Sequence, residues 1–336
     1  MTTPAPAPPP SYLPLPQLDL RPLDQVLAIL HLEERGEHDF IGHSLPGPMG
    51  RVYGGQVMAQ ALVAAARTMP EDTQRCPHSM HGYFLRMGQL GTPIEFAVEA
   101  LHDGGSFSRR RVTASQGERT IMTLTASFQE NQPGVEFAEA MPEAPAPEGL
   151  SSNRKLFTGS PHPAAAAMAL HYGAFDMRHA DGHVYFRNGD AAAGNTQQVW
   201  MRANQPLPDN TPQILHRALL AYSCDQVMLE PVLRSTGLSW TSPGLSVASL
   251  DHSMWFHRHL DVRDWLLYAQ DSPSSQGGRG LGRASVFDRR GRLVASIAQE
   301  GMIRVPLDEG TAGDDDGAAV GDDGSGAGKP GGGEPG

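Results

Sequence analysis

One segment of the sequence occurs twice, and this repeat constrains the fold more than any other feature. GGQVMAQAL at 54–62 matches CDQVMLEPV at 224–232, an offset of 170 residues. HSM recurs 174 residues after its first copy, at 252–254, and SFQE is followed 170 residues later by IAQE. Because the three matches keep the same order, they predict two copies of one structural unit within the chain.

Each copy has the same order of expected elements. In the first copy, good helix formers at 57–69 follow Gly54 and Gly55, which allow a tight turn into a helix. In the second copy we expect the helix at about 212–234. Four β-like runs follow each helix, several of them alternating apolar and polar residues between turn signals. They span 78–86, 94–104, 106–116 and 119–130 in the first copy and 245–258, 265–273, 282–293 and 294–305 in the second.

One helix followed by antiparallel strands predicts an α+β fold in each copy, with the helix on one face of the sheet. Two such copies can join their sheets edge to edge, which hides the exposed edge strands. Composition then sets the boundaries. A Pro-, Glu- and Ala-rich segment at 131–150 is expected to be a linker between folded segments at 20–130 and 151–307. The Pro-rich head at 1–19 and the Gly- and Asp-rich tail at 308–336 are expected to be disordered.

Charge and cysteine usage exclude several classes of protein. The formal net charge is −11, which does not favour binding to nucleic acid. Cys76 and Cys224 are the only cysteines in the sequence, a count that suits a reducing cytoplasm better than a disulfide-stapled secreted protein. The N-terminus lacks the pattern of a signal peptide, and no run of eighteen apolar residues predicts a membrane span. We therefore expect a cytoplasmic protein.

Seven stretches, taken together and in order, are far more specific than any one of them. They are RVYGGQVMAQAL, HSMHGYFLR, GSFSRRRV, TASFQ, LDHSMWFHR, DWLLY and ASIAQEGMIR. On these stretches the sequence resembles the acyl-CoA thioesterase II family, the TesB-like thioesterases. The resemblance covers about residues 25–130 and 197–305. The resemblance implies a double hotdog fold, in which a curved antiparallel sheet wraps a helix in each half. It also implies that acyl-CoA is the substrate, that no metal or redox cofactor takes part, and that chains pair into homo-oligomers.

The resemblance further implies one catalytic site, built mainly from the second half. Its Asp, hydroxyl residue and Gln match Asp225, Ser249 and Gln299. Asp225, expected at a helix start, would take a proton from water, while Ser249 and Gln299 would hold that water. Unpaired backbone N–H groups at the helix start are the expected donors to the developing oxyanion. The first copy has Gly55 where the second has Asp225, so only one copy keeps the base.

The residue types alone leave other roles open for this set. An Asp at a helix start is commonly a cap, and a Ser in a strand is commonly a half-buried polar residue. Gln299 has a counterpart in Gln129, which favours a structural role shared by both. Two alternative functions stay open for the protein as a whole. It could be a catalytically inactive acyl-CoA-binding module or a hotdog enoyl-CoA hydratase. The hydratase is disfavoured because 225–231 offers no His four to five residues after the Asp.

Other polar groups are weaker candidates for a site. Cys224 is a possible nucleophile, although a free Cys is more often a buried small hydrophobic residue. His252, His257 and His259 have a metal-like spacing, yet on a strand the first faces away from the other two. Structural hydrogen bonding is therefore favoured over a zinc site.

Two surface features bear on the path of CoA. Arg279 and Arg283 are suited to binding CoA phosphates, and equally to keeping the surface soluble. DGGSFS at 103–108 contains two glycines but lacks the Lys-Ser/Thr of a phosphate loop, so it predicts a hairpin turn that is also a candidate to line the CoA path.

Overall fold

The computed structural model describes residues 21–47, 50–70, 73–186 and 194–305. The first half contains β1 (Glu33–Glu34), β2 (Asp39–Gly42), β3 (Cys76–Phe84), β4 (Ile94–Asp103), β5 (Phe107–Gln116) and β6 (Arg119–Gln129). The second half contains β7 (Phe175–His179), β8 (Thr196–Ala203), β9 (Ser246–Ser249), β10 (Asp251–Phe256), β11 (Leu266–Gln276), β12 (Arg279–Asp288) and β13 (Leu293–Arg304). The predicted disordered head and tail lie outside the described residues.

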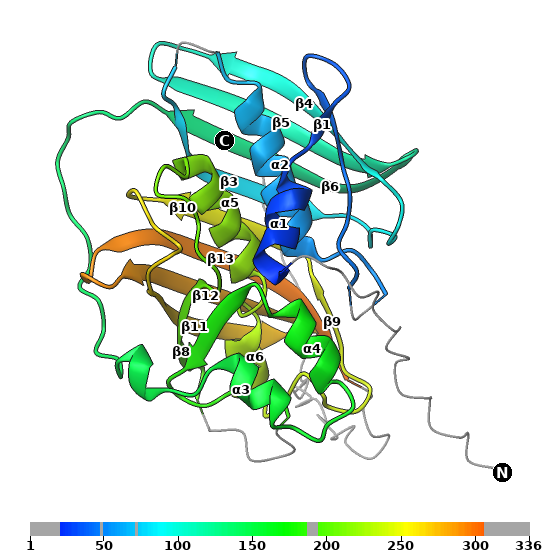
Figure 1. Cartoon of the computed structure of the whole chain (residues 1–336), viewed down its shortest axis with the longest axis vertical. Helices are drawn as coiled ribbons and strands as arrows, with labels where there is room; N and C mark the ends of the chain where they lie inside the picture. Colours follow the sequence, from blue (N-terminus) through cyan, green and yellow to red (C-terminus); the bar gives the residue numbers. More distant parts are fainter. Residues whose placement is uncertain (1–20, 48–49, 71–72, 187–193, 306–336) are drawn as a thin grey trace, which may run out of the picture. The chain divides into compact units, whose positions relative to one another are not determined.

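The strands of the described chain form one continuous antiparallel sheet (Figure 1). Its order is β1-β2-β4-β5-β6-β3 in the first half and β10-β13-β12-β11-β8-β7 in the second, with β9 beside β13. Each of the eight β-like runs overlaps a strand, and the run at 245–258 is divided into β9 and β10 at Leu250. The turn between β4 and β5 is the expected hairpin, closed by a hydrogen bond from Gly104 N to Phe107 O of 2.8 Å.

The two halves meet along β3 and β10, which pair as antiparallel neighbours. Met80 of the first HSM lies opposite Met254 of the second, so equivalent residues of the repeat face each other across this seam. Two strand edges that would be exposed in separate units are therefore covered. The domain boundaries given above remain predictions, but the sheet itself runs through the seam without a break.

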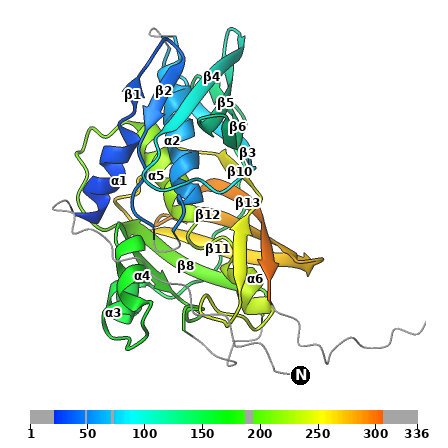
Figure 2. The same ribbon diagram turned by 90° about the vertical axis from the view of Figure 1, so that its right-hand side faces the viewer.

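The helices of the described residues are α1 (Pro22–Leu30), α2 (Gly54–Arg67), α3 (Asn153–Thr158), α4 (Ala165–His171), α5 (Gln213–Cys224) and α6 (Glu230–Ser235), with a 3₁₀ turn at Pro147–Gly149. None of them is long and apolar enough to cross a membrane. α2 and α5 pack against each other on one face of the sheet (Figures 1 and 2). One buried apolar cluster includes Met58 and Leu62 from α2 together with Leu219 from α5, so the halves share a core.

Two helix predictions need correction. Gly54 and Gly55 are the first residues of α2 and do not precede it. The helix expected at about 212–234 is divided into α5 and α6 by a turn at 225–229. Pro231 supplies the physical reason, because it has no N–H to donate to Val227 O four residues earlier. That carbonyl instead accepts hydrogen bonds from Glu230 N at 3.1 Å and from the Gln270 side chain at 3.0 Å.

The segment predicted to be a linker has no helix or strand from 131 to 146. Its later part is fastened to β8, because Trp200 Nε1 donates to Pro145 O at 2.8 Å and Gln198 Nε2 donates to Glu143 O at 2.9 Å. Met141 and Leu150 pack against the cluster that contains Trp200. The connection between the halves therefore follows the surface of the second half.

Candidate active site

Asp225 lies at the point where the second helix breaks. It is the C-terminal cap of α5 and the first residue of the turn at 225–229, and not at the start of its own helix as the sequence predicted. It therefore does not cap the N-terminus of its own helix or of α6, whose N-cap is Leu229. The turn projects the carboxylate toward β9, β13 and the beginning of α2, which supply its hydrogen-bond donors among the described residues.

The three residues predicted for the site are brought together by separate elements. Ser249 ends β9 and Gln299 lies in β13, the strand that pairs with β9. Ser249 Oγ donates to Asp225 Oδ1 at 3.0 Å, and Gln299 Nε2 donates to the same oxygen at 2.8 Å. Gln299 Nε2 also donates to Ser249 Oγ at 2.9 Å. The carboxylate, hydroxyl and amide thus form a closed triangle of hydrogen bonds.

The fourth group at this site comes from the first copy of the repeat. Gly55 N donates to Asp225 Oδ2 at 2.8 Å, so the helix start at the site belongs to α2. A Cβ atom on Gly55 would lie 2.5 Å from Tyr222 O and 2.7 Å from the Tyr53 ring, which no side chain tolerates. A Cβ on Gly54 would lie 3.0 Å from Asp225 Oδ2. Close backbone approach therefore explains why this copy has glycine where the other has aspartate.

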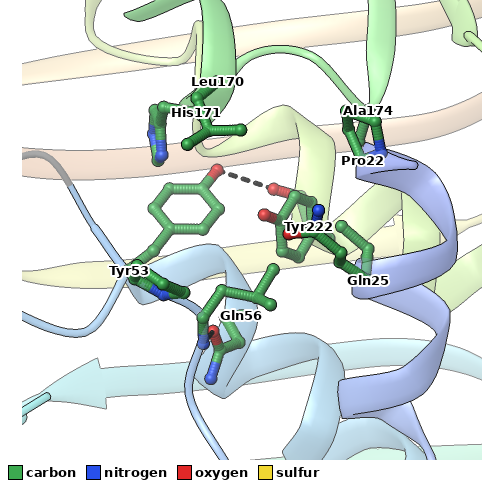
Figure 3. A pocket seen from close by; sticks show the side chains of 11 residues that line it. Pro22, Gln25, Tyr53, Gln56, Leu170, His171, Ala174 and Tyr222 are labelled. Atoms are coloured by element: carbon green, nitrogen blue, oxygen red, sulfur yellow. Dashed lines mark hydrogen bonds between the residues drawn. The ribbon is translucent and has the colours of Figure 1, made fainter. Parts of the chain in front are cut away.

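Aromatic side chains and the Arg51 guanidinium lie near enough to the carboxylate for its charge to act on them. Tyr53 OH donates to Tyr222 O at 2.6 Å, and its ring meets the His171 ring edge-on with centroids 4.9 Å apart (Figure 3). Burial lowers the pKa of His171 to about 4, so this ring is neutral near pH 7. Burial also raises the pKa of Tyr53, and the Asp225 charge raises it further. No sequence motif marked His171, because α4 lies in the segment that matches the family poorly.

A small cavity adjoins these aromatic rings. Its volume is about 30 Å³, and it lies between α1, the segment before α2, α4 and α5 (Figure 3). The side chains of Gln25, Tyr53, Gln56, Leu170 and His171 contribute to its wall. A volume of this size holds a water molecule and is too small for a fatty acyl chain. An acyl group would enter here only if Tyr53 and its neighbours moved.

The structure gives the remaining candidates other partners. Cys224 is buried, and burial raises the pKa of its thiol, which disfavours a thiolate nucleophile. His252 Nδ1 lies 2.7 Å from Gln299 Oε1, whereas His257 Nε2 lies 2.9 Å from Ser296 Oγ. β10 ends at Phe256, so His257 and His259 lie beyond the strand on which their faces were compared. Among the described residues no group of three potential metal ligands occurs.

Both candidate CoA-binding arginines form ion pairs on the exposed strands of the second half. Arg279 Nε lies 3.1 Å from Glu300 Oε1, and Arg283 pairs with Asp271. The Asp271 carboxylate raises the pKa of Arg283 through hydrogen bonding and charge. These pairs favour a role in the protein surface over a dedicated phosphate site.

Comparison with known proteins supports this architecture. The family described as Acyl-CoA thioesterase matches residues 174–302, and the Acyl-CoA thioesterase N-terminal domain matches residues 44–129. Acyl-CoA thioesterase 2 of Haemophilus influenzae is 35% identical over 84% of this chain and 98% of its own length. Human acyl-coenzyme A thioesterase 8 is 33% identical over 86% of this chain and 92% of its own length.

Solved structures agree with these relatives. An acyl-CoA thioesterase II from Mycobacterium marinum is 36% identical, with a TM-score of 0.68, over 84% of this chain and 98% of that one. A hot dog protein from Alicyclobacillus acidocaldarius, 20% identical with a TM-score of 0.66, shares the fold. The α+β double hotdog fold predicted from the sequence is confirmed, and with it the class of hotdog thioesterases. Within that class, the chain belongs to the acyl-CoA thioesterase II family, whose TesB-like members the sequence resembles.

Proposed function

We propose that Asp225 is the general base that activates water for the hydrolysis of acyl-CoA thioesters, the reaction after which the family is named. One observation carries the assignment: the Asp225 carboxylate receives hydrogen bonds from Ser249, Gln299 and the Gly55 amide. These donors come from two strands and from the other copy of the repeat, so the carboxylate has a fixed orientation. Fixed orientation of the reacting group is a large part of enzymatic rate enhancement.

The two carboxylate oxygens have different tasks in this proposal. Oδ1 accepts from both Ser249 and Gln299, which occupies its two lone-pair directions. Within the described part of the chain, Oδ2 accepts only the Gly55 amide, so it has capacity to accept a proton of a water molecule. A Cβ on Gly54 would lie 3.0 Å from this oxygen, so the glycine places no side chain beside Oδ2.

The proposed reaction balances with water as the single co-substrate. Asp225 Oδ2 takes a proton from water as the water oxygen bonds to the thioester carbonyl carbon. The tetrahedral intermediate collapses with cleavage of the C–S bond, and the proton held by Asp225 goes to the departing CoA sulfur. The products are a carboxylic acid and free CoA. In this scheme Ser249 and Gln299 hold the carboxylate, whereas the family resemblance implies that they hold the water.

Free-thiol release from acyl-CoA substrates of short, medium and long chain tests the proposal. Asp225→Asn should lower kcat by about 10²- to 10⁴-fold, the usual contribution of a general base. Asp271→Asn is the control, because it removes a carboxylate that only pairs with an exposed arginine. If Asp225→Asn and Asp271→Asn are equally active, the assignment of the base is wrong.

A second outcome would change the proposed function itself. If the wild-type protein binds acyl-CoA but releases no thiol at any chain length, the chain is a binding module and not an enzyme. Pairing of chains into homo-oligomers and a cytoplasmic location also remain predictions, and light scattering of the purified protein would test the first.

A further inference from the structure

The fully buried imidazole of His252 has no part in the reaction proposed above, yet it touches one of its groups. His252 lies in β10 with 1% of its surface exposed, beside Gln299, which is 0% exposed. His252 Nδ1 and Gln299 Oε1 are 2.7 Å apart. On the other side of the ring, Nε2 lies 3.6 Å from Cys224 Sγ.

The hydrogen bonds that link His252, Gln299 and Asp225 have only one consistent assignment of donors and acceptors. The Asp225 carboxylate only accepts, so the Gln299 group that faces it at 2.8 Å must be the amide nitrogen. The Gln299 oxygen then faces His252, and because an amide oxygen also only accepts, the proton between them belongs to His252 Nδ1. Burial lowers the pKa of His252, which favours the neutral ring with its single proton on Nδ1.

We propose that His252 is a positioning residue that holds the Gln299 amide with its nitrogen toward Asp225 and Ser249. Without this donor, the Gln299 oxygen would be a buried acceptor lacking its partner, and rotation of the amide by half a turn would become competitive. The rotated amide would direct its oxygen at the Asp225 carboxylate, so two acceptors would face each other. The triangle of hydrogen bonds that orients the base would then be lost.

The first half of the molecule shows that this contact is not a general property of the repeat. His78 of the first HSM is the counterpart of His252, and its Nε2 lies 2.8 Å from Ser127 Oγ. Gln129 of the first half bonds to Gln132 instead, at 3.4 Å. An irregularity in β3 between Pro77 and Ser79 leaves His78 without a paired residue in β6. The His-to-Gln contact therefore occurs in the half that contains Asp225.

Two substitutions at His252 separate positioning from packing. Asn places a side-chain N–H where Nδ1 lies, whereas Leu fills the volume without a donor. His252→Leu should lower kcat by about 10- to 100-fold, with KM changed by less than about threefold, since a buried acceptor loses its partner. His252→Asn should recover about tenfold of that loss. His78→Leu and His78→Asn are the matched controls, and both should keep kcat within about twofold of wild type.

The inference rests on the proposed function, and its failure is distinguishable from failure of that function. If His252→Leu and His252→Asn have equal kcat while Asp225→Asn is inactive, His252 has no positioning role and the base assignment stands. If the variants do not fold, the protonation of the two His252 ring nitrogens in the wild-type protein tests the inference. Nitrogen NMR of the histidine-labelled protein should show His252 with a protonated Nδ1 and an unprotonated Nε2, and the opposite tautomer would overturn the inference.

Discussion

The two copies of the Gln-Val-Met segment supply different groups to the same carboxylate site. In the second copy the segment begins in a turn after α5, and Asp225 contributes its side chain. In the first copy the segment is the beginning of α2, and Gly55 contributes its backbone N–H to Asp225. Both copies take part in one site, with complementary roles of acceptor and donor.

The different surroundings of the two positions also explain why one holds glycine and the other aspartate. At Gly55 the Tyr222 carbonyl and the Tyr53 ring occupy the space that a Cβ atom would need. At Asp225 the end of a helix and the following turn leave room for a side chain that reaches the donors of β9 and β13. Three changes would break or sharpen this contrast, and they follow from the largest expected effect to the smallest.

Placing a carboxylate in both copies should have the largest effect. Gly55→Asp adds a side chain against backbone and aromatic atoms and puts a second negative charge beside Asp225. Overpacking and like-charge repulsion together should lower the free energy of unfolding by about 3 kcal/mol or more. Urea denaturation measures this loss. Gly105→Asp is the control, because a Cβ there meets nothing within 4 Å.

A Gly55→Asp protein as stable as Gly105→Asp and more active than wild type would contradict the contrast. It would show that the beginning of α2 can hold a second base.

The two equivalent glutamines should respond unequally to truncation. Gln299→Ala removes a hydrogen bond to a charged group, and kcat should fall by about 10- to 100-fold. Gln129→Ala removes only a long contact to Gln132, so kcat should stay within about twofold of wild type. Thiol release under saturating acyl-CoA measures both. Equal losses would mean that the glutamines serve the shared structural role that the sequence left open.

The smallest effect concerns the contact of the first copy with α4 and its dependence on pH. His171 packs on Tyr53 with its pKa lowered to about 4, whereas an unfolded histidine titrates near pH 6.5. Between these values the unfolded chain binds the proton more tightly, so stability is fully present above pH 6.5 and is lost as pH falls toward 4. The full shift corresponds to about 3 kcal/mol, which partial exposure of the ring reduces to about 1–2 kcal/mol.

Thermal unfolding of wild type and His171→Phe across this pH range isolates the contribution. Phe keeps a ring against Tyr53 and cannot titrate, so the variant should lose less Tm than wild type between pH 6.5 and 4. Parallel losses in the two proteins would show that His171 is not responsible.

Much of the fold was accessible from the sequence. Alternation of apolar and polar residues located the strands that follow α2 and α5, and the repeat predicted that they form two equivalent sets. The sequence did not predict β1, β2, β7 or β8, which precede those helices. The break of the second helix was predictable in principle, because Pro231 stands six residues after Asp225 and cannot continue an α-helical ladder. The good helix formers on both sides of Pro231 favoured one continuous helix instead. α3 and α4 are short and form through packing with the rest of the chain, so local propensity did not reveal them.

The candidate site could be predicted from the sequence only in part, because some of its contacts depend on how distant elements pack. Asp225, Ser249 and Gln299 were found through family resemblance, and the structure places them within hydrogen-bond distance of one another. In the sequence His252 stands out only as part of a histidine cluster. Its hydrogen bond to Gln299 depends on the pairing of β10 with β13, which the sequence did not predict. The Gly55 contact depends on which backbone group approaches a side chain 170 residues away. No pattern of side chains encodes such an approach.

The Gly55 contact bears on how the history of the duplication can be traced. A donor in the main chain is present whatever the neighbouring side chains become, so the first copy can diverge in almost every residue identity while still donating a hydrogen bond to Asp225. Alanine scanning would record Gly55 only as a position intolerant of bulk. Replacing its amide by an ester, which removes this N–H and leaves every side chain unchanged, would detect the hydrogen bond that this half contributes.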